Sequence, residues 1–395
     1  MMRKPLLALA VAAFGIGTTE FIIMGLLPDL ARGFSVSIPV AGTLVSAYAL
    51  AVTIGSPLVV LALAKVDRKR ALIVLMSIFI LGNAACAMAP NFHLLLLARI
   101  CTALSHGSFF GIGSIVASNV VPREQRARAV AIMFSGLTLA NVLGVPAGTA
   151  LGQALGWRAA FWAIVPIGLL AGAGVWALVP HQHSDPVHLK HELKSVMRRG
   201  VLMTLLISTM SSAAMFCVLT YITPILEIVT HITPHGVTGV LVLFGVAITV
   251  GNLLGGVMAD SQGFRAVAVG FLILTGLFLV MPIAEQHVTP ALIAVALWGM
   301  LHFAVGAPLQ TRVVDQARGA QNLASTLNQG AFNLGNALGA ALGALVLTHG
   351  FGYRTLSLAS AAVAALTACL TVLAIVWERE DKKKSDERLR FAMGQ

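Results

Sequence analysis

The sequence predicts an all-α membrane protein in which twelve transmembrane helices form two parallel six-helix repeats. The first observation is composition: 58% of the 395 residues are hydrophobic and only 10% are charged, whereas a soluble domain carries about a quarter charged residues. The second is that the apolar residues form continuous runs of the roughly 20 residues that a helix needs to cross a bilayer, without the alternation of a transmembrane barrel. The third is that motifs of the first half recur in the second.

Continuous apolar runs predict twelve spans, at 5–27, 38–62, 71–90, 94–120, 128–150, 158–180, 201–229, 236–258, 266–284, 290–310, 323–348 and 355–377. The first run follows basic residues as in a signal peptide, but it continues past any plausible cleavage site, which favours an uncleaved span. The chain therefore divides into an N-terminal six-helix bundle at 1–180, a linker at 181–200, a C-terminal six-helix bundle at 201–377 and a charged tail at 378–395.

Basic residues are distributed unevenly between the two sides of the expected bilayer. With the N-terminus inside, most of the 26 Lys and Arg residues fall in inner segments, and the outer loops contain only Arg32, Arg158 and Arg354. This positive-inside pattern predicts that both termini are cytoplasmic. It also accounts for the net charge of +11 without nucleic-acid binding. The tail mixes both signs of charge, which suits solvent or lipid headgroups.

Cysteine and histidine spacings do not predict a metal site. Four cysteines fall singly within spans, as small buried apolar residues do: Cys86, Cys101, Cys217 and Cys369. The linker carries four histidines, for which metal binding and a solvated connector are both open and the connector is favoured: His181, His183, His188 and His191.

The first span contains an acid, Glu20, about fifteen residues into an apolar run that begins at Pro5. A charged side chain at the bilayer centre costs about 2.5–3.5 kcal/mol on insertion scales, so it must face other helices or a water-filled cavity. Two interpretations are open: Glu20 carries a proton, or it is the permanent partner of an intramembrane cation. Asp29, after Pro28, is expected in the following outer loop.

In the fourth span, Arg99 and His106 lie seven residues apart and share a helix face. Arg99 could tune the proton affinity of Glu20 or hold a polar substrate, or it could anchor neighbouring backbone carbonyls. His106 has room beside Gly107 and Ser108. It is either a packed neutral histidine or a proton relay.

Two pairs of motifs identify the internal repeat. GWR at 156–158 recurs as GYR at 352–354, and NVLGVPAG at 141–148 recurs as NALGAALG at 336–343. Six spans per repeat is an even number, so the halves are parallel. Glycines at four-residue spacing permit close helix contact and Pro146 allows a bend, which suggests a seam between the halves that opens and closes. The amides of Asn141, Asn333 and Asn336 either bind substrate hydroxyls or join helices.

The loop GGVMADSQGFR at 255–265 resembles the signature loop of the major facilitator superfamily. The resemblance covers essentially the whole chain and implies that family's fold and a transport function. It also implies a cytoplasmic latch, formed by Gly256, Asp260, Gly263 and Arg265. The matching first-half segment, VLALAKVDRKR at 60–70, is degenerate, because Val60 and Ala64 stand at the glycine and aspartate positions.

Two further motifs narrow the resemblance. ARICTALSHG at 98–107 resembles the family's fourth-helix motif, whose arginine falls on Arg99. GLTLANVLGVPAG resembles the fifth-helix motif of antiporters, through Gly136, Gly144, Pro146 and Gly148. With TTEF, SHGSFFGIG and GWR, the chain is similar to bacterial sugar-efflux and arabinose-efflux-like transporters of the drug–proton antiporter branch. This likeness implies a monomer in the bacterial inner membrane, the proton as coupling ion and no other cofactor, with Glu20 at the proton site.

The same resemblance implies a central path, and the polar residues expected to line it are Tyr48, Asn141, Tyr221, His302, Gln310, Gln329, Asn333 and Asn336. We therefore expect a proton-coupled exporter of sugars or small drug-like molecules that works by alternating access. A proton-coupled sugar importer is the alternative. A membrane-embedded enzyme would need paired acids, a metal cluster or a nucleophile with a base, and none has suitable spacing. A transport-inactive sensor is a further alternative. Neither a small polar solute nor a lipophilic cation is excluded as substrate.

Overall fold

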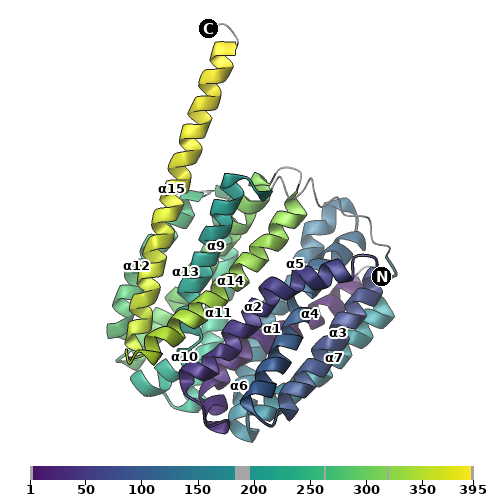
Figure 1. The fold of residues 1–395 in the computed structure, drawn as a ribbon, viewed down its shortest axis with the longest axis vertical. Helices are drawn as coiled ribbons and strands as arrows, with labels where there is room; N and C mark the ends of the chain where they lie inside the picture. The colour runs from purple at the N-terminus through teal and green to yellow at the C-terminus, as the bar shows by residue number, and fades with distance from the viewer. Residues whose placement is uncertain (1–2, 183–195, 262–263, 318–319, 393–395) are drawn as a thin grey trace.

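The computed structural model describes residues 3–182, 196–261, 264–317 and 320–392, and within these ranges every regular element is a helix (Figure 1). Twelve helices of this described part are long and apolar enough to cross a membrane. The predicted all-α fold class is therefore confirmed. Because twelve is an even number of spans, both termini lie on one face of the molecule, which we call the terminal face; the opposite one is the far face.

The N-terminal half contains six spans, of which the fifth is divided into three pieces. In chain order its helices are α1 (Arg3–Gly33), α2 (Ile38–Ala62), α3 (Arg68–Met88), α4 (Phe92–Asn119), the short 3-10 helix η1 (Arg123–Gln125), α5 (Arg126–Leu139), the π-helix η2 (Ala140–Gly144), α6 (Val145–Leu155) and α7 (Trp157–Leu178).

The C-terminal half also contains six spans, and its first is interrupted after Leu219. Its helices are α9 (Arg199–Leu219), α10 (Ile222–Pro224), the π-helix η3 (Ile225–Val229), α11 (Pro234–Ser261), α12 (Phe264–Ala284), α13 (Val288–Gln316), α14 (Gln321–Thr348) and α15 (Arg354–Ala392).

Two segments expected outside the spans are helical. The interpretation of Asp29 as a loop residue is wrong, because α1 continues through Pro28 to Gly33. Proline does not end the helix there, and Asp29 pairs with Arg32 one turn later at 2.6 Å. The charged tail begins within α15, which continues as one helix to Ala392 and extends beyond the other helices (Figure 1).

Side-chain caps start three helices of the first half. Ser37 accepts a hydrogen bond from the backbone NH of Val40, and Pro39 follows in the first turn of α2. Asp67 caps α3 by accepting from the NH of Arg70, and Asn91 caps α4 in the same way. Such caps satisfy backbone donors that have no partner within the helix, so these residues place the starts of three spans.

The same pairs of spans pack against each other in both halves. In the first half α1 packs on α5 and α7, α2 on α4, and α3 on α4 and α7. In the second half the equivalent pairs are α9 with α14 and α15, α11 with α13, and α12 with α13 and α15. The repeat inferred from sequence motifs is thus also a repeat of packing.

The arginines of the repeated GWR and GYR motifs make equivalent contacts. Arg158 at the start of α7 donates to the carbonyl of Ala89, just beyond α3, at 2.9 Å. Arg354 at the start of α15 donates to the carbonyl of Pro282 near the end of α12 at 2.8 Å. Each arginine therefore ties the sixth span of its half to the end of the third, where carbonyls lack helical partners.

The two halves meet mainly through α2 with α14, and through α11 with η2 and α6. The glycines of the fifth-helix motif lie elsewhere: Gly136, Gly144 and Gly148 face residues of α1 in their own half, and Pro146 lies in the first turn of α6. At the boundary it is Gly245 of α11 that lies on the backbone of Asn141, where a Cβ would meet the Asn141 carbonyl. One close contact between the halves is thus made at the π-helix η2.

On the terminal face, the first residues of the linker are bound to the loop between α2 and α3. The carboxylate of Asp67 accepts from His181 Nδ1 and from the NH of Gln182, both at 2.9 Å. Of the linker histidines only His181 is described; His183, His188 and His191 lie outside the described residues. In the expected latch, Gly256 and Arg265 are exposed, whereas Gly263 and the side chain of Asp260 lie outside the described part.

Candidate functional site

The buried acid of the first span lies in a cluster of polar side chains from α1, α2 and α4. Glu20 is 8% exposed, and its Oε2 lies 3.8 Å from Nε2 of His106. The other ring nitrogen of His106, Nδ1, is 3.2 Å from the hydroxyl of Tyr48. His106 therefore lies between Glu20 and Tyr48, within hydrogen-bond distance of the Tyr48 hydroxyl but too far from the carboxylate for a direct hydrogen bond.

Arg99 is fully buried beside this cluster but does not bind the acid directly. Its Nη1 donates to the carbonyl of Thr19 at 2.7 Å, and its guanidinium carbon lies 4.0 Å from the centroid of the Tyr48 ring. Within the described part of the chain, Arg99 and Glu20 form no direct ion pair. Arg99 therefore anchors α4 to α1, and its positive charge lies close to Glu20.

A cavity of about 990 Å³ lies between the two halves and reaches the terminal face. At that end it is lined by Asn119, the last residue of α4, and by the exposed Arg126, the first residue of α5. Deeper in the molecule its lining includes His106. The cavity is at the upper end of the size range of small-molecule sites, and it touches the Glu20 cluster through His106.

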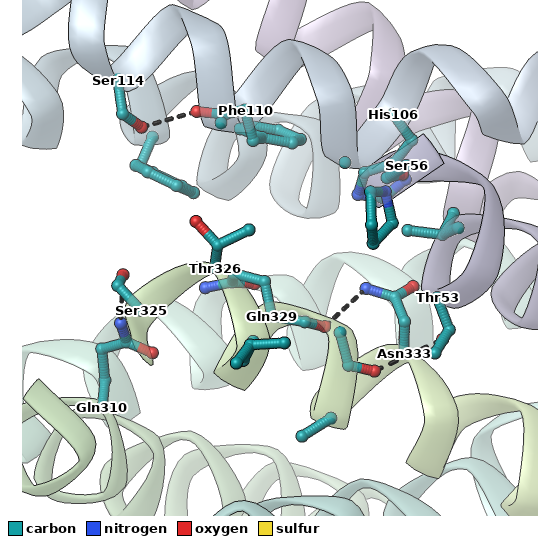
Figure 2. A pocket seen from close by; sticks show the side chains of 18 of the residues that line it. Thr53, Ser56, His106, Phe110, Ser114, Gln310, Ser325, Thr326, Gln329 and Asn333 are labelled. Atoms are coloured by element: carbon teal, nitrogen blue, oxygen red, sulfur yellow. Dashed lines mark hydrogen bonds between the residues drawn. The ribbon is translucent and has the colours of Figure 1, made fainter. Parts of the chain in front are cut away.

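Three of the expected path residues line this cavity, Gln310, Gln329 and Asn333, together with His106, which was expected at the proton site. Figure 2 shows His106, Ser56 and Phe110 on one side of the space and Gln329 and Asn333 on the other. Both polar atoms of the Gln310 amide are hydrogen-bonded: its oxygen accepts from Asn328 at 2.6 Å, and its nitrogen donates to Ser325 at 2.7 Å.

The other expected path residues are outside the described lining. Tyr48 is behind His106, and His302 lies within 3.5 Å of Ser211. The repeat-related amides join neighbouring groups: Asn141 donates to the Leu137 carbonyl at 3.0 Å, and Asn336 accepts from Ser212 at 2.8 Å.

Tyr221 is fully buried toward the far face, where α9 is interrupted. Its hydroxyl donates to the carbonyl of Ala340 in α14 at 3.0 Å. The ring fills the space left by two glycines, Gly42 of α2 and Gly343 of α14. Close by, Thr223 donates across the halves to the carbonyl of Met24 at 2.7 Å. These contacts close the far side, while the cavity reaches the terminal face.

Sequence reasoning missed most of the cavity wall, including Ser56, Phe110 and Phe134. Ser56 lies one turn from Val52 and directly before Pro57, and a hydroxyl next to proline within an apolar span is the signal that could have identified it. Phe110 and Phe134 stack with ring centroids 5.0 Å apart and planes 15° apart. No sequence pattern distinguishes these two from lipid-facing phenylalanines.

Comparisons with known proteins bear on the family and the fold of the chain. A family model described as Major Facilitator Superfamily matches residues 9–322 and 205–392. The chain is 48% identical over 373 residues to the "Inner membrane transport protein YdhP" of Escherichia coli K12, covering 94% of this chain and 96% of that protein.

Two more distant relatives have names that state an activity. One is a "Chloramphenicol resistance protein" of Streptomyces lividans, 33% identical with 89% of this chain and 91% of that protein covered. Another is a "Probable sugar efflux transporter" of Helicobacter pylori 26695, 31% identical with 94% and 93% covered. A bacterial homologue of the human lysosomal transporter Spinster, solved inward-facing and unoccupied, has a TM-score of 0.76 at 16% identity, covering 94% of this chain and 96% of that chain.

Proposed function

The chain belongs to the Major Facilitator Superfamily, and from this premise we propose that it is a proton-coupled exporter of sugars or small drug-like molecules in a bacterial inner membrane. It works as a monomer, by alternating access. The members of this family are transporters rather than enzymes, and the named relatives include an efflux protein and a resistance protein. The terminal face is cytoplasmic in this proposal, as the distribution of basic residues predicts.

The observation that carries the proposal is the contact of Glu20 with His106 beside the cavity. A carboxyl group buried among membrane helices is stable only if it is neutralised or paired. Here its contact is a histidine, which can hold or release a proton itself. The pair therefore changes its charge by one when it takes up a proton, next to the space where a solute binds.

Alternating access requires that the two ends of the path open in turn. In this state the cavity reaches the terminal face, and the far side is closed by Tyr221 and by the Thr223–Met24 hydrogen bond. A solute enters from the cytoplasm, the far-side contacts separate, and a proton from outside binds the Glu20 cluster as the solute leaves. Returning the proton inward across 100 mV supplies about 2.3 kcal/mol, enough for a roughly 50-fold gradient.

The test replaces Glu20 with glutamine and measures proton movement in liposomes when chloramphenicol or arabinose is added. We expect Glu20→Gln to abolish solute-driven proton movement, because an amide cannot exchange a proton at these pH values. Glu20→Asp is the matched control, which keeps the carboxyl group and should keep part of the coupling. Full coupling in Glu20→Gln would exclude Glu20 as the proton carrier.

The direction of transport needs a separate measurement in cells. An uncoupler removes the proton gradient, so the internal concentration of the substrate of an exporter rises and that of an importer falls. A fall would favour the sugar importer, which uses the same residues with the opposite coupling.

A further inference from the structure

The wall of the cavity contains hydrogen-bonding groups that have no partner in the protein. The hydroxyl of Ser56 is buried and unpaired, and so is Oδ1 of Asn333, although the amide nitrogen of Asn333 donates to the carbonyl of Gln329 at 3.0 Å. Both side chains are more than nine-tenths buried, with 8% and 6% exposed. Buried polar atoms are normally satisfied, so each of these atoms lacks a partner that a solute in the cavity could supply.

These open groups face each other across the cavity. Ser56 belongs to α2 in the first half, whereas Asn333 and Gln329 belong to α14 in the second (Figure 2). Gln329 is exposed and lines the cavity, and it accepts the hydrogen bond from Asn333 with its backbone carbonyl rather than its side-chain amide. A solute between them meets one hydroxyl that can donate, one carbonyl that can accept, and one amide that can do both.

Another part of the wall is apolar and includes a flat aromatic surface. Phe110 and Phe134 stack nearly parallel, and the apolar lining also includes Val52, Val130 and Leu334. Aromatic faces of this kind favour a planar apolar group on the solute.

The described lining contains no carboxylate. Glu20 is not among the lining residues, and His106 lies between it and the cavity. The charged residue in the described lining is Arg126, which is exposed at the mouth. A cation that entered would lose its hydration without gaining an opposite charge, and this is strongly unfavourable.

Building on the proposed export function, we infer that the cavity selects an uncharged solute with hydroxyl groups at one end and a planar apolar group at the other. The hydroxyl end binds Ser56, Gln329 and Asn333, and the apolar end lies against Phe110 and Phe134. Lipophilic cations are excluded, and a free hexose fills only the polar part of the site.

The experiment measures binding to the purified full-length protein in detergent by titration calorimetry, with detergent alone as blank. The probes are 4-nitrophenyl β-D-glucoside, which has both ends, glucose, which has only the polar end, and tetraphenylphosphonium, which is apolar and cationic. We expect the aryl glucoside to bind about tenfold or more tightly than either of the others. Equal or tighter binding of tetraphenylphosphonium or of glucose would overturn the inference.

Variants locate the binding in this cavity. Asn333→Leu and Ser56→Ala each remove one open group and should weaken binding of the aryl glucoside about threefold to tenfold. Ser114→Ala is the matched control: Ser114 also lines the cavity, but its hydroxyl already donates to the Phe110 carbonyl at 2.6 Å. If Ser114→Ala weakens binding as much as the other two, or if neither of those has an effect, the assignment is wrong.

This measurement is independent of proton coupling, because no gradient is present. Tight binding of the aryl glucoside together with unaltered coupling in Glu20→Gln would contradict only the coupling role of Glu20. Normal coupling of wild-type protein together with preferential binding of the cation would contradict only the selectivity.

Discussion

The turn between α12 and α13 contains an acid whose ionisation should destabilise the folded protein. Glu285 is 2% exposed, and its Oε1 accepts a hydrogen bond from Ser357 at 2.7 Å, while Oε2 has no partner. Burial raises the pKa of Glu285 from 4.5 to about 7, although the hydrogen bond from Ser357 and the positive charge of Arg354 act in the opposite direction. In the unfolded chain the same carboxyl loses its proton near its ordinary pKa.

The sign and the size of the effect follow from these values. Between pH 4.5 and about 7 the folded protein holds a proton that the unfolded chain has lost, so stability falls as the pH rises. The cost reaches about 3 kcal/mol above pH 7, since each tenfold change in a protonation equilibrium is worth about 1.4 kcal/mol. Glu285→Gln removes the charge and keeps an oxygen that accepts from Ser357. It should therefore stabilise the protein by about 1 kcal/mol at pH 5 and about 3 kcal/mol at pH 8.

The assay compares melting temperatures of wild-type protein and Glu285→Gln in detergent at pH 5 and pH 8. We expect the variant to melt a few degrees higher at pH 8, with a smaller difference at pH 5. Glu380→Gln is the control, since it makes the same substitution at an exposed acid on α15. An equal difference between wild type and Glu285→Gln at both pH values would refute the reasoning.

Two further perturbations test the far-side closure and the linker anchor. Gly42→Ala places a methyl group against the ring of Tyr221, so the closed far side is destabilised. In this variant, a cysteine introduced at Thr223 should react faster with an impermeant maleimide added from outside. An unchanged reaction rate would count against Tyr221 as part of the closure. Asp67→Ala removes the cap of α3 and the hydrogen bonds to His181 and Gln182, so we expect a loss of about 1 kcal/mol, seen as a lower melting temperature. Burial would raise the pKa of Asp67, but hydrogen bonds from Arg70, His181 and Gln182 lower it overall, so this contribution is present at neutral pH and is lost only as the pH falls below the ordinary aspartate range.

The number and position of the spans could be predicted from the sequence, because bilayer thickness determines how long an apolar run must be. The ninth span was expected at 266–284, and α12 is Phe264–Ala284. The ends of the spans were less predictable where the composition changes from apolar to charged while the helix continues. α15 continues past Trp377 into the charged segment, and Glu378 there pairs with Arg312 of α13 at 3.0 Å.

The sequence by itself determined that an acid, an arginine and a histidine lie within the membrane, since their cost in lipid requires partners. Only the tertiary structure decided which partners these are. Arg99 binds the carbonyl of Thr19, and His106 rather than Arg99 contacts Glu20. Tyr221 packs against glycines, whereas Ser56 faces the cavity. The physical reason is that a membrane helix is apolar on almost all sides, so its hydropathy places it in the bilayer but leaves its rotation to packing against its neighbours.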